Sequence, residues 1–493
     1  MKRTEHVPIR PPETPSVSEL PIITRLFITA LLSILILAVG VPAAEGGAAT
    51  GAVGTDERGV AGPGSGVDAT VTRDGETVRY ELAFSPGSDL DNVWVVVSGA
   101  SIVESEGFER VGTGGRTQLR WTGNERARLV LAVRAPWEGA ADGPASGRES
   151  VATEAWAFAS VPFVEIQRVS DGEIERSWPL TERGGALADA DGVFGDRYAL
   201  IGSADVVSRS VAGQRVDVVV PAGTTPGEDP AAVADALVEA DWRLDVGARD
   251  GAVLAYAAPG VRRGGESVPA RDEFWVRADS RLDDPENVWL HEYVHTRQSF
   301  RLATEMRWFR EASAEYYAAR LSYEGGYVDR AAFREHLAGA PSRATLTDPD
   351  TWADRPVPHD KGGRVLAVLD GKIRTETDGH RSLQDVFRRL NRHDGAVTYA
   401  DFVRAVNGVA GTPMDAWLDR HVDGAEPVAD QYHDGQPLGG NLGGVEEPSP
   451  AITFLLVSAG LSFVAAAPLY RFLRRREARR GENRSSDRAP QAG

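Results

Sequence analysis

Two histidines four residues apart, His291 and His295, enclose a glutamate in the pentapeptide His-Glu-Tyr-Val-His. Residues at this spacing lie on one face of an α-helix, so both imidazoles can bind the same metal ion. Glu292 follows the first histidine and is placed to accept a proton from a water molecule on that metal. The pattern is typical of zinc-dependent hydrolases, and it predicts that Glu292 is the general base.

The residues before the histidines carry signals for the start of a helix. Asp284 can cap a helix, Pro285 suits the first helical position, and Glu286 adds an acid to the first turn. These signals predict a helix over residues 285–302. The alternative is an ordinary amphipathic helix with surface histidines.

A catalytic zinc site needs a third protein ligand and an open fourth position for water. The segment W-F-R-E-A-S-A-E-Y-Y, residues 308–317, offers Glu311 and Glu315 four residues apart on one helix face. We expect Glu311 to be the metal ligand. Glu315 would then accept the outer N–H of a ligating histidine. The reverse assignment of the two glutamates stays open.

The two segments together resemble the gluzincin metallopeptidases, in which a W-x-x-E-x-x-x-x-Y segment carries the glutamate ligand. Residues 358–363, P-H-D-K-G-G, are similar to the P-Y-x-K-G segment of the membrane alanyl and glycyl aminopeptidase families. The stretches K-I-R-T-E-T-D-G-H-R-S-L-Q-D-V-F-R-R-L and D-F-V-R-A-V-N-G-V-A-G most resemble the glycyl aminopeptidase family. The resemblance covers roughly residues 250–425, and it implies Zn²⁺ as cofactor and a peptide as substrate.

Two positions depart from the pattern of these families. The tyrosine of the P-Y-x-K-G segment, which stabilises the oxyanion in the families, is His359 here, and a histidine can also donate to an oxyanion. Tyr316 and Tyr317 are the other candidates for that role. Glu266 lies near the position of a family glutamate that binds the free amine of the substrate, but the G-x-M-E-N-like strand around it is not reproduced. Aminopeptidase and endopeptidase action therefore both stay open.

The composition limits the other possibilities. The chain has no cysteine, which excludes disulfides, thiol catalysis and cysteine-ligated metal sites. Its formal net charge is −18, and lysine occurs only at Lys2, Lys361 and Lys372. This balance argues against nucleic-acid binding. It indicates a halophilic protein, or else an acidic protein from a GC-rich genome.

Two apolar segments predict the membrane topology. The first, residues 26–41, follows several cations and is either a signal peptide or an N-terminal membrane anchor within residues 1–44. The second, residues 452–470, is long enough to span a bilayer, and six arginines follow it before residue 481. We expect a transmembrane helix over residues 451–470, a basic cytoplasmic tail over residues 471–493, and a catalytic domain outside the cell membrane.

The remaining sequence predicts a multidomain α+β fold. Short alternating segments predict an N-terminal β-sandwich, and a mixture of strands and helices around the histidines predicts a thermolysin-like zinc domain followed by a C-terminal helical domain. Five histidines have no partner motif and are expected at the surface or in packing: His336, His380, His393, His421 and His433. The expected regions are a flexible linker at 45–67, the β-sandwich at 68–160, the zinc domain at 161–325, a helical cap domain at 326–430 and a stalk linker at 431–450.

These observations together predict a membrane-anchored, extracellular-facing zinc metallopeptidase, with aminopeptidase action favoured. One alternative is a catalytically silent gluzincin relative that acts as a peptide-binding or cell-surface interaction module. Another is a metallohydrolase that acts on something other than peptides, or a structural cell-surface protein.

Overall fold

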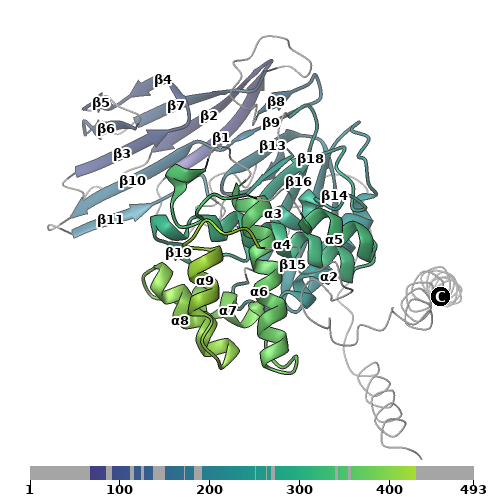
Figure 1. The fold of residues 1–493 in the computed structure, drawn as a ribbon. Coiled ribbons are helices and arrows are strands. Elements are labelled where there is room, and N and C mark those ends of the chain that lie inside the picture. The colour runs from purple at the N-terminus through teal and green to yellow at the C-terminus, as the bar shows by residue number, and fades with distance from the viewer. Residues whose placement is uncertain are drawn as a thin grey trace, which may run out of the picture. The chain divides into compact units, whose positions relative to one another are not determined.

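The structure is a computed structural model, and the parts of the chain described here lie between residues 67 and 428. The described ranges are 67–84, 92–111, 116–123, 127–136, 150–170, 173–181, 191–249, 251–261, 264–267, 272–338, 342–352 and 357–428. Within these ranges the first half of the chain is built mainly of strands and the second half mainly of helices (Figure 1). The mixed α+β architecture predicted from the sequence is confirmed.

The N-terminal part contains two antiparallel sheets that share one apolar core. The order of the four-stranded sheet is β1-β2-β7-β4, and that of the five-stranded sheet is β11-β10-β3-β6-β5. Strand β2 explains the core, because its alternate residues Val78, Tyr80, Leu82 and Phe84 are buried while the residues between them are more exposed. The strands are β1 (Val67–Asp74), β2 (Thr77–Phe84), β3 (Asn92–Ser98), β4 (Ser101–Glu106), β5 (Phe108–Arg110), β6 (Thr117–Trp121), β7 (Ala127–Arg134), β10 (Phe163–Ser170) and β11 (Glu173–Ser177).

The sheets do not end at residue 160, where the sequence suggested a boundary. Strand β10 pairs with β3 over seven residues, from Phe163 opposite Ser98 to Val169 opposite Asn92. The strand before β10 joins a different sheet of order β12-β13-β9-β8, formed by β8 (Val151–Ala152), β9 (Trp156–Ser160), β12 (Gly192–Phe194) and β13 (Tyr198–Gly202). The expected boundary at residue 160 therefore separates β10 from its partner strand β3, which lies about 70 residues earlier in the chain.

A mixed sheet of order β14-β15-β16-β18-β17 supports the metal-binding helices. Strands β15, β16 and β18 are parallel, and the short strand β17 is antiparallel at one edge. Neighbouring residues of β18 face opposite sides: Phe274 and Val276 belong to the core shared with the helices, and Trp275 to a separate cluster. The strands are β14 (Ala204–Val211), β15 (Gln214–Pro221), β16 (Ala252–Ala258), β17 (Gly265–Ser267) and β18 (Glu273–Arg277).

The rest of the described chain is mainly helical, including the region 326–430 where the sequence predicted a helical cap domain. Asp229 caps α2 with its side chain, and Pro230 is the first residue of the helix. Capping boxes begin α7 at Ser382 and α8 at Thr398. The helices are α2 (Pro230–Arg243), α3 (Val288–Thr296), α4 (Trp308–Glu324), α5 (Arg330–Ala338), α6 (Gly363–Glu376), α7 (Leu383–Asn391), α8 (Tyr399–Ala410) and α9 (Asp415–His421).

The helix that carries the histidines is shorter than predicted. Helix α3 spans Val288–Thr296, whereas residues 285–302 were expected. The amide of Glu286 donates to the Asp284 side chain, so these residues form a turn and not the first helical turn. Asn287 is the residue that caps the helix, and its side chain accepts from the amide of Leu290. The histidines therefore lie on a nine-residue helix whose residues from Trp289 onward are all buried.

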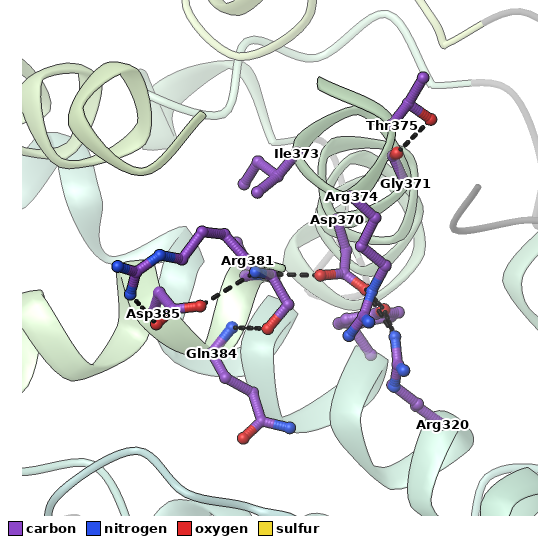
Figure 2. A network of polar contacts seen from close by, with 12 residues as sticks. Arg320, Asp370, Gly371, Ile373, Arg374, Thr375, Arg381, Gln384 and Asp385 are labelled. Carbon is purple, nitrogen blue, oxygen red and sulfur yellow. Dashed lines mark hydrogen bonds and ion pairs between the residues drawn. The ribbon is translucent and has the colours of Figure 1, made fainter. Parts of the chain in front are cut away.

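A buried carboxylate holds the helices of the C-terminal part together. Asp370 on α6 bonds Arg320 on α4 at 2.5 Å and Arg374 at 2.8 Å, and it also accepts from the amide of Leu383 at the start of α7. Figure 2 shows the guanidinium groups of Arg320 and Arg374 next to the Asp370 carboxylate, and both contact its Oδ2. Because Arg320 lies on the same helix as the two glutamates of interest, this network fixes the position of α4.

The segments with predicted membrane roles lie outside the described residues. This applies to residues 1–44, to nearly all of the linker at 45–67, and to residues 431–450, 451–470 and 471–493. Across the described ranges, the structure contains no helix with the length and apolar character needed to span a bilayer.

Candidate metal centre

Helices α3 and α4 bring three metal-binding side chains to one point. His291 and His295 lie on one face of α3, and Glu311 lies in the first turn of α4. One donor atom from each of these residues lies within 4.8 Å of the other two. Both histidines are buried, with 8% and 5% of their surface exposed. The structure thus brings together the three residues that the sequence predicted as metal ligands.

The Glu311 carboxylate is the centre of the arrangement. Its Oε2 lies 3.5 Å from Nε2 of His291, 3.3 Å from Nε2 of His295 and 3.4 Å from Nε2 of His359. Two imidazole nitrogens and one carboxylate oxygen, partly shielded from water, form the donor set of catalytic zinc sites. The residues present therefore fit a zinc ion held by His291, His295 and Glu311.

Glu315 contacts two histidines at once. Its Oε2 lies 3.5 Å from Nδ1 of His291, on the side of the ring away from Glu311, and its Oε1 lies 2.5 Å from Nε2 of His336. The first contact is the one that the sequence suggested for Glu315. His336 was expected at the surface or in packing; instead α5 packs against α4 and places this ring on the Glu315 carboxylate. No sequence signal connects these two residues, which lie 21 positions apart.

The second histidine also has an outer partner, which the sequence analysis did not identify. Nδ1 of His295 lies 3.0 Å from Oε1 of Gln298, a fully buried residue. The Gln298 amide in turn donates to the carbonyl of Arg310 and to Oγ of Ser313, both on α4. These bonds orient the His295 ring, as outer partners of metal-binding histidines commonly do. The position of Gln298, three residues after His295, was the only available signal.

The charges of the site favour ionised acids. Burial would raise the pKa of Glu311, but hydrogen bonds from His291, His295 and His359 lower this pKa well below its usual range. Burial likewise would raise the pKa of Glu315, and hydrogen bonds from His291 and His336 lower it. Burial would lower the pKa of His291, yet its bonds to the two glutamates raise that pKa to about 10. The paired acids thus supply the negative charge that a cation needs.

The predicted general base lies against the edge strand of the sheet. Glu292 is buried, and a Cβ atom added at Gly265 on β17 would lie 2.7 Å from its Cγ and 2.8 Å from its Oε1. The backbone of β17 thus limits where the Glu292 carboxylate can go. The next strand residue, Glu266, pairs directly with Trp275, and opposite residues of a pair share one face of a sheet. Trp275 belongs to the cluster on the face away from the helices, so the pairing directs Glu266 toward that face.

His359 lies beside the three predicted ligands. It belongs to a short π-helix, Pro358–Gly362, and its ring stacks on that of His291 with centroids 5.5 Å apart. Among the described residues its Nδ1 has no hydrogen-bond partner. The two alternative tyrosines are engaged elsewhere: the Tyr316 hydroxyl donates to Asp370, and the Tyr317 ring packs against Phe387. His359 is therefore the candidate oxyanion donor that the structure places at the site.

Comparison with known proteins finds a similarity in structure and no match in sequence. No protein-family model and no curated protein sequence matches the chain. Its structure is similar to that of an aminopeptidase N family protein from Idiomarina loihiensis, with 14% identity, a TM-score of 0.52, and coverage of 74% of this chain and 76% of that one. An M1 zinc metallopeptidase from Deinococcus radiodurans is 16% identical over 74% of this chain and 94% of that one, with a TM-score of 0.43.

The aminopeptidase A of Legionella pneumophila gives a similar result, with 12% identity over 73% of this chain and 49% of that one, and a TM-score of 0.42. At these identities the similarity shows a fold shared with the aminopeptidase N family protein. The activity has to be argued from the residues of the site.

Proposed function

We propose that this chain is a zinc-dependent metallopeptidase of the gluzincin type, and that it acts as an aminopeptidase. One observation carries the proposal: His291, His295 and Glu311 offer three donor atoms within 4.8 Å of one another, with Glu292 next to the first ligand. The fold of an aminopeptidase N family protein around these residues supports it. A helix with surface histidines would have no reason to bury both imidazoles against a glutamate.

The residues around the proposed zinc have complementary roles. Zinc, when bound, acts as a Lewis acid that polarises the scissile carbonyl and lowers the pKa of a water molecule. Glu292 accepts the proton of the attacking water and passes it to the leaving amine. His359 donates a hydrogen bond to the oxygen of the scissile carbonyl as negative charge develops on it. Glu315 and Gln298 hold the two ligand histidines in their orientation.

Aminopeptidase action depends on a group that binds the free amine of the substrate. Glu266 is our candidate, because of its place in the sequence before the metal motif. Its pairing opposite Trp275 directs its side chain to the face away from the metal-binding helices, which is evidence against this role. Endopeptidase action is the alternative that this pairing favours, and the substrates used in the experiment separate the two.

The membrane attachment is part of the same proposal and rests on the sequence. The apolar residues 452–470 are followed by a cluster of arginines, which is typical of a transmembrane helix with a cytoplasmic C-terminus. We propose that the metal centre faces the outside of the cell. Cleavage of the metal-binding part by a protease added to intact cells would support this topology, and full protection of that part in cells shown to be intact would refute it.

The test is peptide hydrolysis by the purified full-length chain, loaded with zinc, at high and at moderate salt. The substrates are matched peptides with a free or an acetylated N-terminus. Glu292→Gln is the control variant, because it keeps the metal ligands and removes the base. If wild type cleaves only the peptides with a free N-terminus, and Glu292→Gln does not cleave them, the protein is an aminopeptidase. Cleavage of both kinds establishes an endopeptidase, and equal rates for wild type and Glu292→Gln refute the peptidase.

A further inference from the structure

A chain of three side chains leads from the outside of the metal centre to one of its ligands. Glu315 is 8% exposed and uses its two oxygens separately: Oε2 faces Nδ1 of His291 at 3.5 Å, and Oε1 faces Nε2 of His336 at 2.5 Å. A carboxylate oxygen can only accept, so both imidazoles donate to it. The His291 ring then presents its Nε2 to Glu311.

The contact to His336 is the shorter of the two and comes from a different helix. His336 lies in the last turn of α5, a helix whose Phe333 and Leu337 are buried in the main core. On the other side of Glu315, a Cβ atom added at Gly363 would lie 3.0 Å from its Cγ. The carboxylate is thus held between α5 and the start of α6, with little room to turn.

We propose that His336 is a positioning residue for the metal centre: it fixes the Glu315 carboxylate, which in turn fixes the ring of the ligand His291. This inference rests on the proposed zinc site and names the residue outside the ligand helices on which that site depends. Removal of His336 leaves Oε1 of Glu315 free to rotate toward solvent. The Glu315 carboxylate then adopts several orientations, and only some of them contact Nδ1 of His291. The His291 ring is held less firmly, and the affinity for the metal falls.

The experiment compares zinc affinity among variants of the full-length chain. Zinc dissociation constants are measured by competition with a chromophoric chelator, and visible absorption of the cobalt-substituted protein reports ligand geometry. The variants are His336→Ala, which removes the donor, and His336→Gln, whose side-chain amide can donate from nearly the same place. His380→Asn, at an exposed histidine far along the chain from the ligands, is the matched control.

We expect His336→Ala to weaken zinc binding about 10- to 100-fold, the range found for outer partners of metal ligands, and to change the cobalt spectrum. His336→Gln should restore most of the affinity, and His380→Asn should bind like wild type. In a Glu315→Gln background, His336→Ala should add little, because both changes act through one carboxylate. Wild-type affinity and spectrum in a folded His336→Ala protein overturn the proposal, as does full additivity with Glu315→Gln.

The outcomes separate this inference from the proposed function. A wild-type protein that binds no zinc refutes both. If the wild-type protein binds zinc but hydrolyses no peptide, the proposed peptidase activity is refuted. The zinc affinities of the variants then still decide the role of His336. A wild-type protein that binds zinc and cleaves peptides, with unchanged affinity in His336→Ala, refutes the positioning role alone. Circular dichroism and thermal unfolding of each variant establish that it is folded.

Discussion

Gly265 on the edge strand lies directly against Glu292, and a Cβ atom there would collide with the Glu292 side chain and with Cγ1 of Val288. A Cβ atom at Gly265 would lie 2.7 Å from Cγ and 2.8 Å from Oε1 of Glu292, closer than real Cβ contacts allow. The neighbouring Gly264 differs, since its nearest contact would be 3.5 Å from a methyl group of Val288. Two adjacent glycines thus provide a test of the proposed base and its own control.

We predict that Gly265→Ala lowers kcat for peptide hydrolysis by about 100-fold, because a displacement of a catalytic group by about 1 Å has an effect of this size. Zinc affinity should fall much less than kcat, since the added methyl group would contact Glu292 and Val288 and none of the three ligands. Gly264→Ala should keep nearly all activity. Steady-state kinetics and chelator competition on the two variants are the measurements, and equal kcat values in both variants would show that β17 does not constrain the base.

The two glutamates of α4 should differ in how strongly they affect metal binding. Glu311 lies within reach of both Nε2 atoms, whereas Glu315 contacts just one of the two ligand histidines, His291, through its outer nitrogen. We predict that zinc raises the unfolding temperature of wild type and of Glu315→Gln but not of Glu311→Ala. Zinc at about 100 times its dissociation constant stabilises by about 2.7 kcal/mol. Calorimetry with and without zinc measures this, and the opposite order for the two glutamates would assign Glu315 as the ligand.

His359 should affect the reaction and not the metal. If it donates to the oxyanion, His359→Phe keeps a ring to stack on His291 and loses the donor. We predict a decrease in kcat of about 10²- to 10³-fold, the size found when one oxyanion donor is removed. His359→Tyr, which restores the residue of the resembled families, should retain more activity. Zinc affinity measured in parallel is decisive: a large loss in His359→Phe would make His359 a fourth ligand.

Asp370 should stabilise the fold on which the metal centre depends. It is 1% exposed and contacts both Arg320 and Arg374. Burial alone would raise the pKa of its carboxyl, but these two cations lower that pKa below its usual value. Asp370→Asn leaves two cations beside a neutral amide. We predict a loss of about 3–5 kcal/mol in the free energy of unfolding, the usual effect of removing one partner of a buried ion pair.

Urea unfolding of Asp370→Asn is compared with that of Asp283→Asn, which breaks an exposed ion pair to Arg281. Exposed pairs contribute little because water screens them, so the free energy of unfolding of the control should hardly change. Equal losses in the two variants would show that the network around Asp370 is not a main support of α4.

Local patterns in the sequence were sufficient to name the candidate ligands. Helical spacing places His291 and His295 on one face of a helix, and it places Glu311 and Glu315 on one face of another. The choice between the two glutamates stayed open in the sequence, and the structure groups Glu311 with the histidines. The predicted start of α3 at Pro285 was wrong for a local reason as well. A proline after a capping residue also fits a turn, and the cap of Asn287 decided between the two.

The contacts that could not be predicted from the sequence are those that depend on packing between distant segments. The contact of His336 with Glu315 requires α5 to fold back on α4, and no periodicity encodes that docking. The orientation of Glu266 depends on its pairing opposite Trp275, which a short strand does not reveal. Pairing of β10 with β3 is equally non-local, which explains why the predicted boundary at residue 160 fell between paired strands.

The buried Glu273 should make stability depend on pH between about 4.5 and 8. It is the first residue of β18 and is 1% exposed, and a Cβ atom at Gly195 would collide with its carboxylate. Burial, together with the charges of Asp196 and Asp272, raises the pKa of Glu273 to about 8, while the amide of Tyr198 opposes this by donating to it. The folded protein therefore keeps this proton at pH values where the unfolded chain has lost it.

The sign follows from that difference. Below the unfolded pKa of about 4.5 both states are protonated, and Glu273 adds no pH dependence. Between that value and about 8 the folded state binds one proton more, so its stability falls as pH rises; above about 8 the decrease levels off.

Glu273→Gln removes the ionisable group and should flatten this decrease, which we expect to reach on the order of 3–5 kcal/mol. Urea unfolding of both proteins is measured at intervals between roughly pH 5 and pH 9, the window in which Glu273 titrates. The difference between the two proteins isolates Glu273, because the other titrating groups are common to both. Parallel curves for the two proteins would mean that Glu273 is ionised in the folded state, with the negative charge held by the amides of the turn at Tyr198.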